Sequence, residues 1–255
     1  MRLEEGEQKL SRKVREEKRY VREGLGVVGI SVIIPALNEA ESIGSVVASM
    51  PWAKIAECIV VDNGSTDGTG AIAAAAGARV VTSPRGYGAA MSAGVRAALA
   101  SSEIFVFMDG DGADRVGYMA DLVGPIERGE ADFVLGSRIL GKREPGSMLG
   151  SQVFAAWLIG GLVKILYGYR YSDMCAFRAI RRDALERMHM SEMTFGWNLE
   201  MQIKAIQMGL RVREVPVDYG CRIGGVSKVS GDLKASMQAA WRIFGVFWRV
   251  RKGRE

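Results

Sequence analysis

Short, unbroken apolar runs that alternate with helix-like stretches dominate the first half of the sequence. The runs occupy residues 30–34, 58–61, 79–82 and 104–108. The helix-like stretches lie between them, at 39–50, 69–76 and 88–100. Strands that are apolar at every position are buried on both faces, which is typical of a parallel sheet covered by helices. The pattern predicts an α/β fold with a Rossmann-like, mostly parallel sheet, whose first strand is expected to end at Pro35.

The second half of the sequence mixes strand and helix patterns. Strands are predicted at 132–136, 176–180 and 212–217. Helices, several of them amphipathic, are predicted at 147–168, 197–208 and 232–249. No linker separates these elements from the first half, so both halves are expected to share one sheet.

The chain is long enough for one catalytic domain with a substantial core, since it has 255 residues and 48% of them are hydrophobic. Residues 1–24 alternate Glu with Lys and Arg and are expected to form a charged arm. The domain would span 25–255. It would comprise a nucleotide-binding half (30–115), an acceptor half (116–230) and a basic amphipathic C-terminal helix (231–255).

Composition excludes several classes of protein. The three cysteines, Cys58, Cys175 and Cys221, are far apart, and with the lone His189 they cannot form a zinc site, so reduced thiols in a reducing compartment are expected. The N-terminal residues lack the apolar stretch of a signal peptide. The best candidate span, 153–163, has half the length of about 20 residues that a membrane crossing needs, so no crossing is expected. The net charge of +5 admits nucleic acid, an anionic membrane or phosphorylated ligands.

Polar residues follow the predicted strands of the first half. Right-handed crossovers would place all strand ends at one edge of the sheet, where ligands bind. Asp62 is expected to accept hydrogen bonds from a ribose or a base, and Asp67 to cap a helix. Taken alone, Asn38 and Glu39 fit a helix cap better than a ligand site. The glycines at 85–88 are expected to serve a tight turn and close helix packing.

The strongest site follows the fourth apolar run. Asp109, Asp111 and Asp114 lie within six residues, and three carboxylates at a sheet edge repel one another unless a cation lies among them. Oxygen ligands suit Mg²⁺ or Mn²⁺. A solvated acidic turn is the alternative. The buried strand before the carboxylates, and Asp62 on what is expected to be the neighbouring strand end, favour the metal site.

Basic residues are also expected at this edge of the sheet. Arg138 follows a predicted strand. The segment 222–228 combines a glycine pair with Arg222, Ser227 and Lys228, a composition that can fold over a diphosphate and bind it through charge-assisted hydrogen bonds. A solvated basic loop explains this segment equally well.

Together these residues resemble the inverting family 2 glycosyltransferases of the GT-A fold, and most of all the dolichol- or polyprenol-phosphate mannosyl- and glucosyltransferases. The resemblance covers roughly residues 30–235. Its elements, in order, are SVIIPALNE, VVDNGSTDGT, FMDGDG, VLGSR, SDMCAFRAIRRDAL, FGWNLEMQIKA, VREVPVDY and RIGGVSK. The chain departs from the family pattern at Gly112-Ala113, where Leu-Gln is common. It departs again at Cys175-Ala176, where Ser-Gly is common, and in lacking an early Arg in the helix from Ser147.

The resemblance implies roles for individual residues. Those that would line the nucleoside pocket are Pro35, Ala36, Asn38, Glu39 and Asp62. Asp109 and Asp111 would hold Mg²⁺ or Mn²⁺ and, through it, the diphosphate of a nucleotide sugar. The residues on a loop that closes over the donor would be Arg222, Ser227 and Lys228. Arg138 would face the acceptor phosphate, with Asp173 near the acceptor. UDP-glucose and GDP-mannose both remain open as donors.

The implied reaction is the transfer of a hexose to a polyprenyl or dolichyl phosphate with inversion. The metal, Asp111, Arg222 and Lys228 would stabilise the departing diphosphate. A hydroxyl acceptor would need a general base, for which Glu200 is the best candidate by position, whereas a phosphate acceptor is already ionised. A carboxylate that anchors a loop is an equally good interpretation of Glu200.

Two segments bear on a membrane partner. The segment 148–171 is rich in Phe, Trp and Leu, and 241–252 combines Trp and Phe with Arg and Lys. Such helices suit the surface of a membrane, here its cytoplasmic face, although a core-facing or dimer-facing stripe explains the first segment equally well.

Two alternatives to a lipid-phosphate transferase stay open. They are a transferase that acts on a small-molecule or glycan hydroxyl, and a non-catalytic nucleic-acid-binding module. The module is disfavoured because Asp109 and Asp111 would repel a polyanion. A homodimer stays open.

Overall fold

The computed structural model of the chain describes residues 29–224 and Gly245. The expected arm at 1–24, the loop residues Ser227 and Lys228, and, apart from Gly245, the expected helix at 231–255 lie outside the described residues, and their predictions stay untested.

A seven-stranded sheet forms the centre of the described chain, in the order β3-β2-β1-β4-β6-β5-β7. The strands are β1 (Gly29–Ala36), β2 (Glu57–Asp62), β3 (Arg79–Thr82), β4 (Ser102–Phe107), β5 (Phe133–Ser137), β6 (Arg178–Arg181) and β7 (Val212–Pro216). The helices are α2 (Ile43–Ala48), α3 (Thr69–Ala75), α4 (Tyr87–Ala97), α5 (Met119–Glu127), α6 (Gly150–Tyr167), α7 (Arg182–Met188) and α8 (Trp197–Gln207). A short 3₁₀ helix, η1 (Val116–Tyr118), precedes α5. The predicted mostly parallel α/β sheet flanked by helices is therefore confirmed.

Two apolar cores cover the two faces of the sheet. Along β1, Val32 and Ile34 face the core formed with α2, α3 and α5, whereas Ile33 between them faces the core formed with α4, α7, α8 and one side of α6. Successive side chains of a strand point to opposite faces. Because both faces are covered, each strand needs apolar residues at consecutive positions, which is the pattern seen in the sequence.

The structure corrects two expectations, for β1 and for β2, and it shows the direction of β6. β1 continues through Pro35, because its pairing with β4 ends at Ile33 and the missing N–H breaks no further hydrogen bond there. β6 runs antiparallel to both β4 and β5, so its amino end, not its carboxyl end, lies at the edge of the other strand ends. β2 and β4 are not neighbours, because β1 lies between them. Asp62 and Asp109 are therefore separated by one strand.

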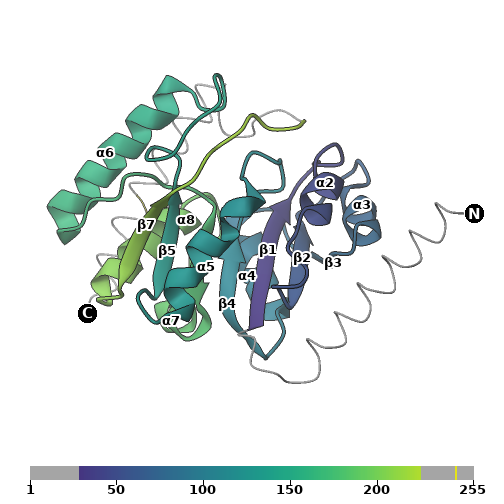
Figure 1. The fold of residues 1–255 in the computed structure, drawn as a ribbon, viewed down its shortest axis with the longest axis horizontal. Coiled ribbons are helices and arrows are strands. Elements are labelled where there is room, and N and C mark those ends of the chain that lie inside the picture. Colours follow the sequence, from purple (N-terminus) through teal and green to yellow (C-terminus); the bar gives the residue numbers. More distant parts are fainter. Residues whose placement is uncertain (1–28, 225–244, 246–255) are drawn as a thin grey trace, which may run out of the picture.

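Helix α6 lies at the far end of the molecule from α3 (Figure 1). By length and composition it could cross a membrane, and only 22% of it is buried. The expectation of no crossing, which counted only 153–163, is therefore not supported by length. Its exposed apolar side chains are Phe154, Trp157, Leu158, Ile165 and Leu166. The buried residues of α6, Ala156, Ile159, Gly160 and Val163, share one side, so the core-facing stripe covers only part of the helix.

Candidate active site

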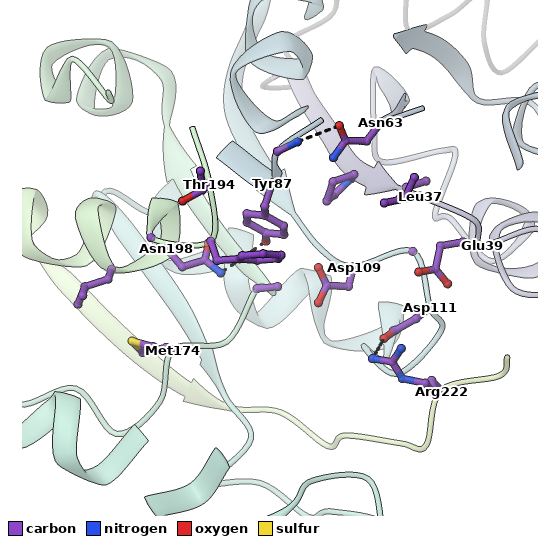
Figure 2. Close-up of a pocket in the computed structure, with 18 of the residues that line it drawn as sticks. Leu37, Glu39, Asn63, Tyr87, Asp109, Asp111, Met174, Thr194, Asn198 and Arg222 are labelled. Carbon is purple, nitrogen blue, oxygen red and sulfur yellow. Dashed lines mark hydrogen bonds and ion pairs between the residues drawn. The ribbon is translucent and has the colours of Figure 1, made fainter. Parts of the chain in front are cut away.

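A cavity of about 700 Å³ opens at the edge where β1, β2 and β4 end. Its lining residues come from these strand ends, from the end of β5, from the start of α4, from α6, from the loop before β6, from the start of α8 and the segment before it, and from 219–222 (Figure 2). The predicted residues that line it are Pro35, Ala36, Glu39, Asp109, Asp111, Arg138 and Arg222. Residues from both predicted halves therefore meet in one cavity.

Asp109 and Asp111 lie on a turn that directly follows β4. The backbone N–H of Asp109 donates to Asp114 Oδ2 at 3.0 Å, and that of Ala113 donates to Asp111 Oδ1 at 3.0 Å. Burial, followed by the charges of Asp114 and Asp111, raises the pKa of Asp109 to about 8. Burial also raises the pKa of Asp114 to about 6. These raised pKa values reflect the free-energy cost of holding several buried carboxylates close together. A bound cation would offset that cost and lower the pKa values again.

The carboxylates at this turn suit a divalent cation that also binds phosphate oxygens. Mg²⁺ is commonly held by one or two carboxylates together with substrate phosphates. Within residues 29–224, no group of three or more His, Cys, Asp or Glu side chains is placed to hold a metal by itself. Asp109 and Asp111 thus fit a metal shared with a ligand and do not form a closed structural site.

Residues 219–223 cross over this turn. Arg222 forms an ion pair with Asp111 at 3.0 Å (Figure 2). The backbone N–H of Ile223 donates to the Asp111 carbonyl at 2.9 Å. Gly112 has a φ of +80°, and a Cβ there would lie 2.5 Å from Ile223 Cδ1. Gly112, a departure from the family pattern, thus leaves the space that the Ile223 side chain occupies. In this position of the segment, the neighbouring Arg222 lines the cavity.

Arg138 and Asp173 form a bidentate ion pair at the other side of the cavity. Nε and one terminal nitrogen of Arg138 lie 2.8 Å from the two oxygens of Asp173, whose side chain is fully buried. The guanidinium also lies over the ring of Tyr219, 5.0 Å from its centroid. Arg138 lines the cavity and Asp173 supports it from behind. The predicted acceptor residues are therefore in contact with each other.

Asn38 and Asp62 are not among the described residues that line the cavity. Asn38 Oδ1 accepts a hydrogen bond from the backbone of Thr66, and Asp62 Oδ1 accepts one from that of Ser65. Asp67 bonds the backbones of Ala40 and Thr69, which is the structural role expected for it. The contacts of Asn38 and Asp62 fix the loops that border the cavity, and a direct ligand role for either residue stays a prediction.

Glu200 does not line the cavity, in contrast to its predicted place as a general base. Its carboxylate is 2% exposed, accepts hydrogen bonds from the backbones of Ser191 and Glu192, and pairs with Lys204 at 2.7 Å. These contacts bind α8 to the segment before it, which continues into cavity residues 194–196. The geometry therefore supports the loop-anchoring interpretation of Glu200.

We expect Glu200→Gln to loosen this segment without removing a proton acceptor. Transfer should fall modestly, mainly through a higher KM, and the pH profile should gain no new basic limb. Stability should fall by about 1–3 kcal/mol, because buried N–H groups lose a charged acceptor. Urea unfolding and kinetics between pH 6 and 9 measure both effects. Loss of about 10²-fold or more in kcat would restore the base assignment.

Several cavity residues escaped the sequence analysis. Asn63 follows β2, Tyr87 opens α4, and Thr194 and Asn198 flank the start of α8 (Figure 2). The Nδ2 of Asn198 lies 3.5 Å from the Tyr87 hydroxyl. In the sequence, one feature pointed to this side of the cavity: the glycine-rich turn at 85–88. Close packing explains that turn in part, since a Cβ at Gly88 would lie 2.1 Å from the Glu192 carbonyl oxygen.

Comparison with known proteins agrees with this geometry. Residues 31–188 match the model of glycosyl transferase family 2. An uncharacterized glycosyltransferase of Mycobacterium tuberculosis is 38% identical over 224 residues, which are 87% of this chain and 97% of the relative. The polyprenol monophosphomannose synthase of Mycolicibacterium smegmatis is 32% identical over 86% of this chain and 89% of its own.

A solved structure shows the same fold. The glucosyl-3-phosphoglycerate synthase of Mycobacterium tuberculosis, in complex with Mn²⁺, UDP-glucose and phosphoglyceric acid, superposes with a TM-score of 0.70. Its sequence is 24% identical, and the match covers 87% of this chain and 79% of that one. At this identity the likeness concerns the fold alone.

Proposed function

Because the chain belongs to glycosyl transferase family 2, we propose that it transfers a hexose from a nucleoside diphosphate sugar to a polyprenyl phosphate, with inversion at the sugar. The observation that carries the proposal is the arrangement of charges around one cavity: a carboxylate pair at the end of β4 between two arginines, Arg222 and Arg138. A negatively charged donor and a negatively charged acceptor can thus be bound from opposite sides.

The donor would bind at the ends of β1, β2 and β4. Asp109 and Asp111 would hold Mg²⁺ or Mn²⁺, which supplies charge neutralisation at the diphosphate and Lewis acidity at the leaving oxygen. Arg222, already within 3.0 Å of Asp111, would add a fixed positive charge beside the diphosphate. Pro35, Ala36 and Glu39 would line the nucleoside side of the cavity.

The acceptor would bind near Arg138. Asp173 and the ring of Tyr219 fix this guanidinium at the cavity wall, and two parallel N–H groups suit a phosphate. Among the described residues that line the cavity, the carboxylates are Glu39, Asp109 and Asp111. Two of them would be engaged by the metal, and Glu200 does not line the cavity. A phosphate acceptor, which is ionised at pH 7 and needs no base, fits this set better than a hydroxyl.

Lipid acceptors are consistent with two further observations. Relatives are named polyprenol monophosphomannose synthase and, in Micrococcus luteus, undecaprenyl-phosphate mannosyltransferase, the latter 30% identical over 80% of this chain. The exposed apolar side of α6 belongs to the same segment as Arg138 and Gln152 at the cavity, and would rest on the cytoplasmic face of a membrane. The alternative is a soluble phosphorylated acceptor, since Arg138 would bind its phosphate equally well.

Activity with candidate donors and acceptors tests the proposal. We expect UDP-glucose or GDP-mannose, polyprenyl phosphate and Mn²⁺ to yield a product that extracts into organic solvent. EDTA should abolish its formation, and added Mn²⁺ should restore it. A product that remains in water, formed from a soluble phosphorylated acceptor, would favour the alternative. Unchanged transfer in EDTA would contradict the metal assignment.

A further inference from the structure

Glu214 is a half-buried carboxylate that lies outside the cavity and has no part in the mechanism described above. It belongs to β7 and is not among the described residues that line the cavity. Its two oxygens accept the backbone N–H of Ser172 at 2.9 and 3.1 Å, and its Oε1 also accepts the Ser172 hydroxyl at 2.7 Å. Burial raises the pKa of Glu214, so holding a charge here has a cost that these hydrogen bonds offset.

The hydroxyl of Ser172 extends this contact to the end of β5. It lies 2.7 Å from the hydroxyl of Ser137, the last residue of β5, which is fully buried. An ionised carboxylate can only accept, so the single proton of the Ser172 hydroxyl points to Glu214 and its oxygen accepts from Ser137. The Ser137 oxygen in turn accepts the backbone N–H of Leu140 at 3.2 Å. Glu214 therefore orders a chain of hydrogen bonds that all run in one direction.

This chain of hydrogen bonds lies beside the Arg138–Asp173 ion pair. Ser137 directly precedes Arg138, and Ser172 directly precedes Asp173. The serine pair and the ion pair thus join the same two segments at neighbouring positions. Glu214 comes from a third segment, because β7 pairs in parallel with β5 (Figure 1). One side chain of β7 therefore ties the end of β5 to the loop before β6.

The loop that carries Asp173 depends on such side chains for its position. Residues 168–177 belong to no helix or strand of the described chain. Within this loop, Asp173 Oδ2 accepts from the backbone N–H and the Nε of Arg138, and Oδ1 accepts from one of its terminal nitrogens. A shift of Ser172 would therefore move Asp173, and Arg138 with it.

The orientation of Arg138 decides which of its N–H groups can meet a ligand. Asp173 engages the edge of the guanidinium that is formed by Nε and one terminal nitrogen. The group is planar, so its other edge, formed by the two terminal nitrogens, points in a different direction. Such an edge binds a phosphate through two parallel N–H groups, provided that the first edge is held in place.

We propose that Glu214 is a positioning residue for the phosphate of the acceptor. It holds Ser172, and through it Asp173, so that Arg138 presents its second edge to the cavity. The inference rests on the proposed function, in which Arg138 binds the acceptor phosphate, and adds a residue that does not touch the substrate. Because β7 lies three strands away from β4 in the sheet, loss of Glu214 should weaken the acceptor and leave the donor unaffected.

Ligand binding to the full chain tests the inference without turnover. The probes are farnesyl phosphate, a short polyprenyl phosphate, and glycerol 3-phosphate, a soluble phosphate monoester, each titrated by calorimetry with UDP and Mn²⁺ present. Glu214→Gln should raise the Kd of whichever probe the wild type binds by about 5- to 50-fold, because a carboxamide cannot accept from Ser172 through both of its ends. The Kd for UDP with Mn²⁺ should change by less than about twofold.

Glu130→Gln provides the matched control. It makes the same change at an exposed carboxylate that pairs with Arg213, the neighbour of Glu214 in β7. It should alter the Kd of neither the acceptor probe nor UDP. Thermal unfolding of each variant identifies a temperature at which all of them are folded, so that a loss of stability is not mistaken for a loss of binding.

Ser172→Ala tests the route by which Glu214 acts, and as a smaller change it keeps the test valid if Glu214→Gln does not fold. Alone it should weaken the acceptor probe and spare UDP. Combined with Glu214→Gln, it should weaken binding by less than the product of the two single effects, because both changes break one network.

Several results would overturn the inference and leave the proposed function standing. They are a folded Glu214→Gln protein that binds the acceptor probe as tightly as the wild type, an equal loss of UDP binding, fully independent effects of the two changes, and a Ser172→Ala protein with unchanged acceptor binding. A wild type that binds UDP but neither acceptor probe would overturn the inference together with the acceptor assigned in the proposed function.

Discussion

Asp109→Asn is expected to lower transfer by about 10²–10³-fold or more, while the metal-free protein stays as stable as the wild type or becomes more stable. The two effects have one cause. Asp109 is held beside Asp111 and Asp114, and burial with this repulsion raises its pKa to about 8. Asparagine removes the cost of keeping this buried carboxyl either charged or protonated in the metal-free protein. It also removes a ligand for the cation that would neutralise the diphosphate.

Three measurements on Asp109→Asn separate these effects. Thermal unfolding in EDTA reports the stability, Mn²⁺ titration reports metal binding, and product formation reports transfer. Asp121→Asn, an exposed carboxylate in the first turn of α5, makes the same charge change and should leave all three unchanged. Wild-type transfer in Asp109→Asn would contradict the assignment of the turn after β4 as the metal site.

Asp173→Asn is expected to destabilise the protein by about 3–5 kcal/mol, because it takes the paired carboxylate away from the largely buried Arg138 guanidinium. Asp173 accepts hydrogen bonds from the backbone and side chain of Arg138 and from the backbone of Met174, at 2.7 to 2.9 Å. The loss of these bonds should also let Arg138 leave the cavity wall. Transfer should then fall through a higher KM for the acceptor, with less effect on the KM for the donor.

Urea unfolding of Asp173→Asn and Asp132→Asn compares two bidentate Arg–Asp pairs that differ in exposure. Arg211 pairs with Asp132 in the same way, but its side chain is 52% exposed, against 17% for Arg138. Solvent screens the more exposed pair, so Asp132→Asn should cost less and leave acceptor kinetics unchanged. Equal destabilisation by the two changes would contradict the role given to burial of Arg138.

Local patterns predicted the elements of the first half, where each strand depends on its own apolar run. Residues 79–82 form β3 as expected, and 69–76 form α3 to within one residue. Two helices were missed: α5 contains Pro125, which argues against a helix in a single sequence, and α7 is a short helix directly after β6. The direction of β6 could not be predicted, because a short apolar run carries no signal for parallel or antiparallel pairing.

At the candidate site, the sequence analysis identified charged residues more successfully than it identified their ion-pair and hydrogen-bond partners. Asp109, Asp111, Arg138 and Arg222 were predicted and do line one cavity. Their ion pairs join residues far apart in the chain, such as Arg138 with Asp173, and no local pattern encodes such a pairing. The anchoring alternative for Glu200 matches the contacts seen, because buried carboxylates mostly bond backbone groups. The capping alternative for Asn38 does not, since its side chain bonds the loop residue Thr66 and the N-cap position of α2 is Ser42.

The reversed direction of β6 has a consequence for the part of the chain that would bind the acceptor in the proposed function. The chain leaves the sheet after β5 and returns at the start of β6, its paired neighbour, so residues 138–177 begin and end at the same edge. This excursion contains α6 and carries Arg138, Met174 and Ala176 into the cavity. The sheet fixes only the points where this excursion departs and returns. The length and the surface of the excursion can therefore change without disturbing the sheet. Under the proposed function, in which Arg138 binds the acceptor, a change in this excursion alone would change the acceptor and leave the donor side of the sheet edge as it is.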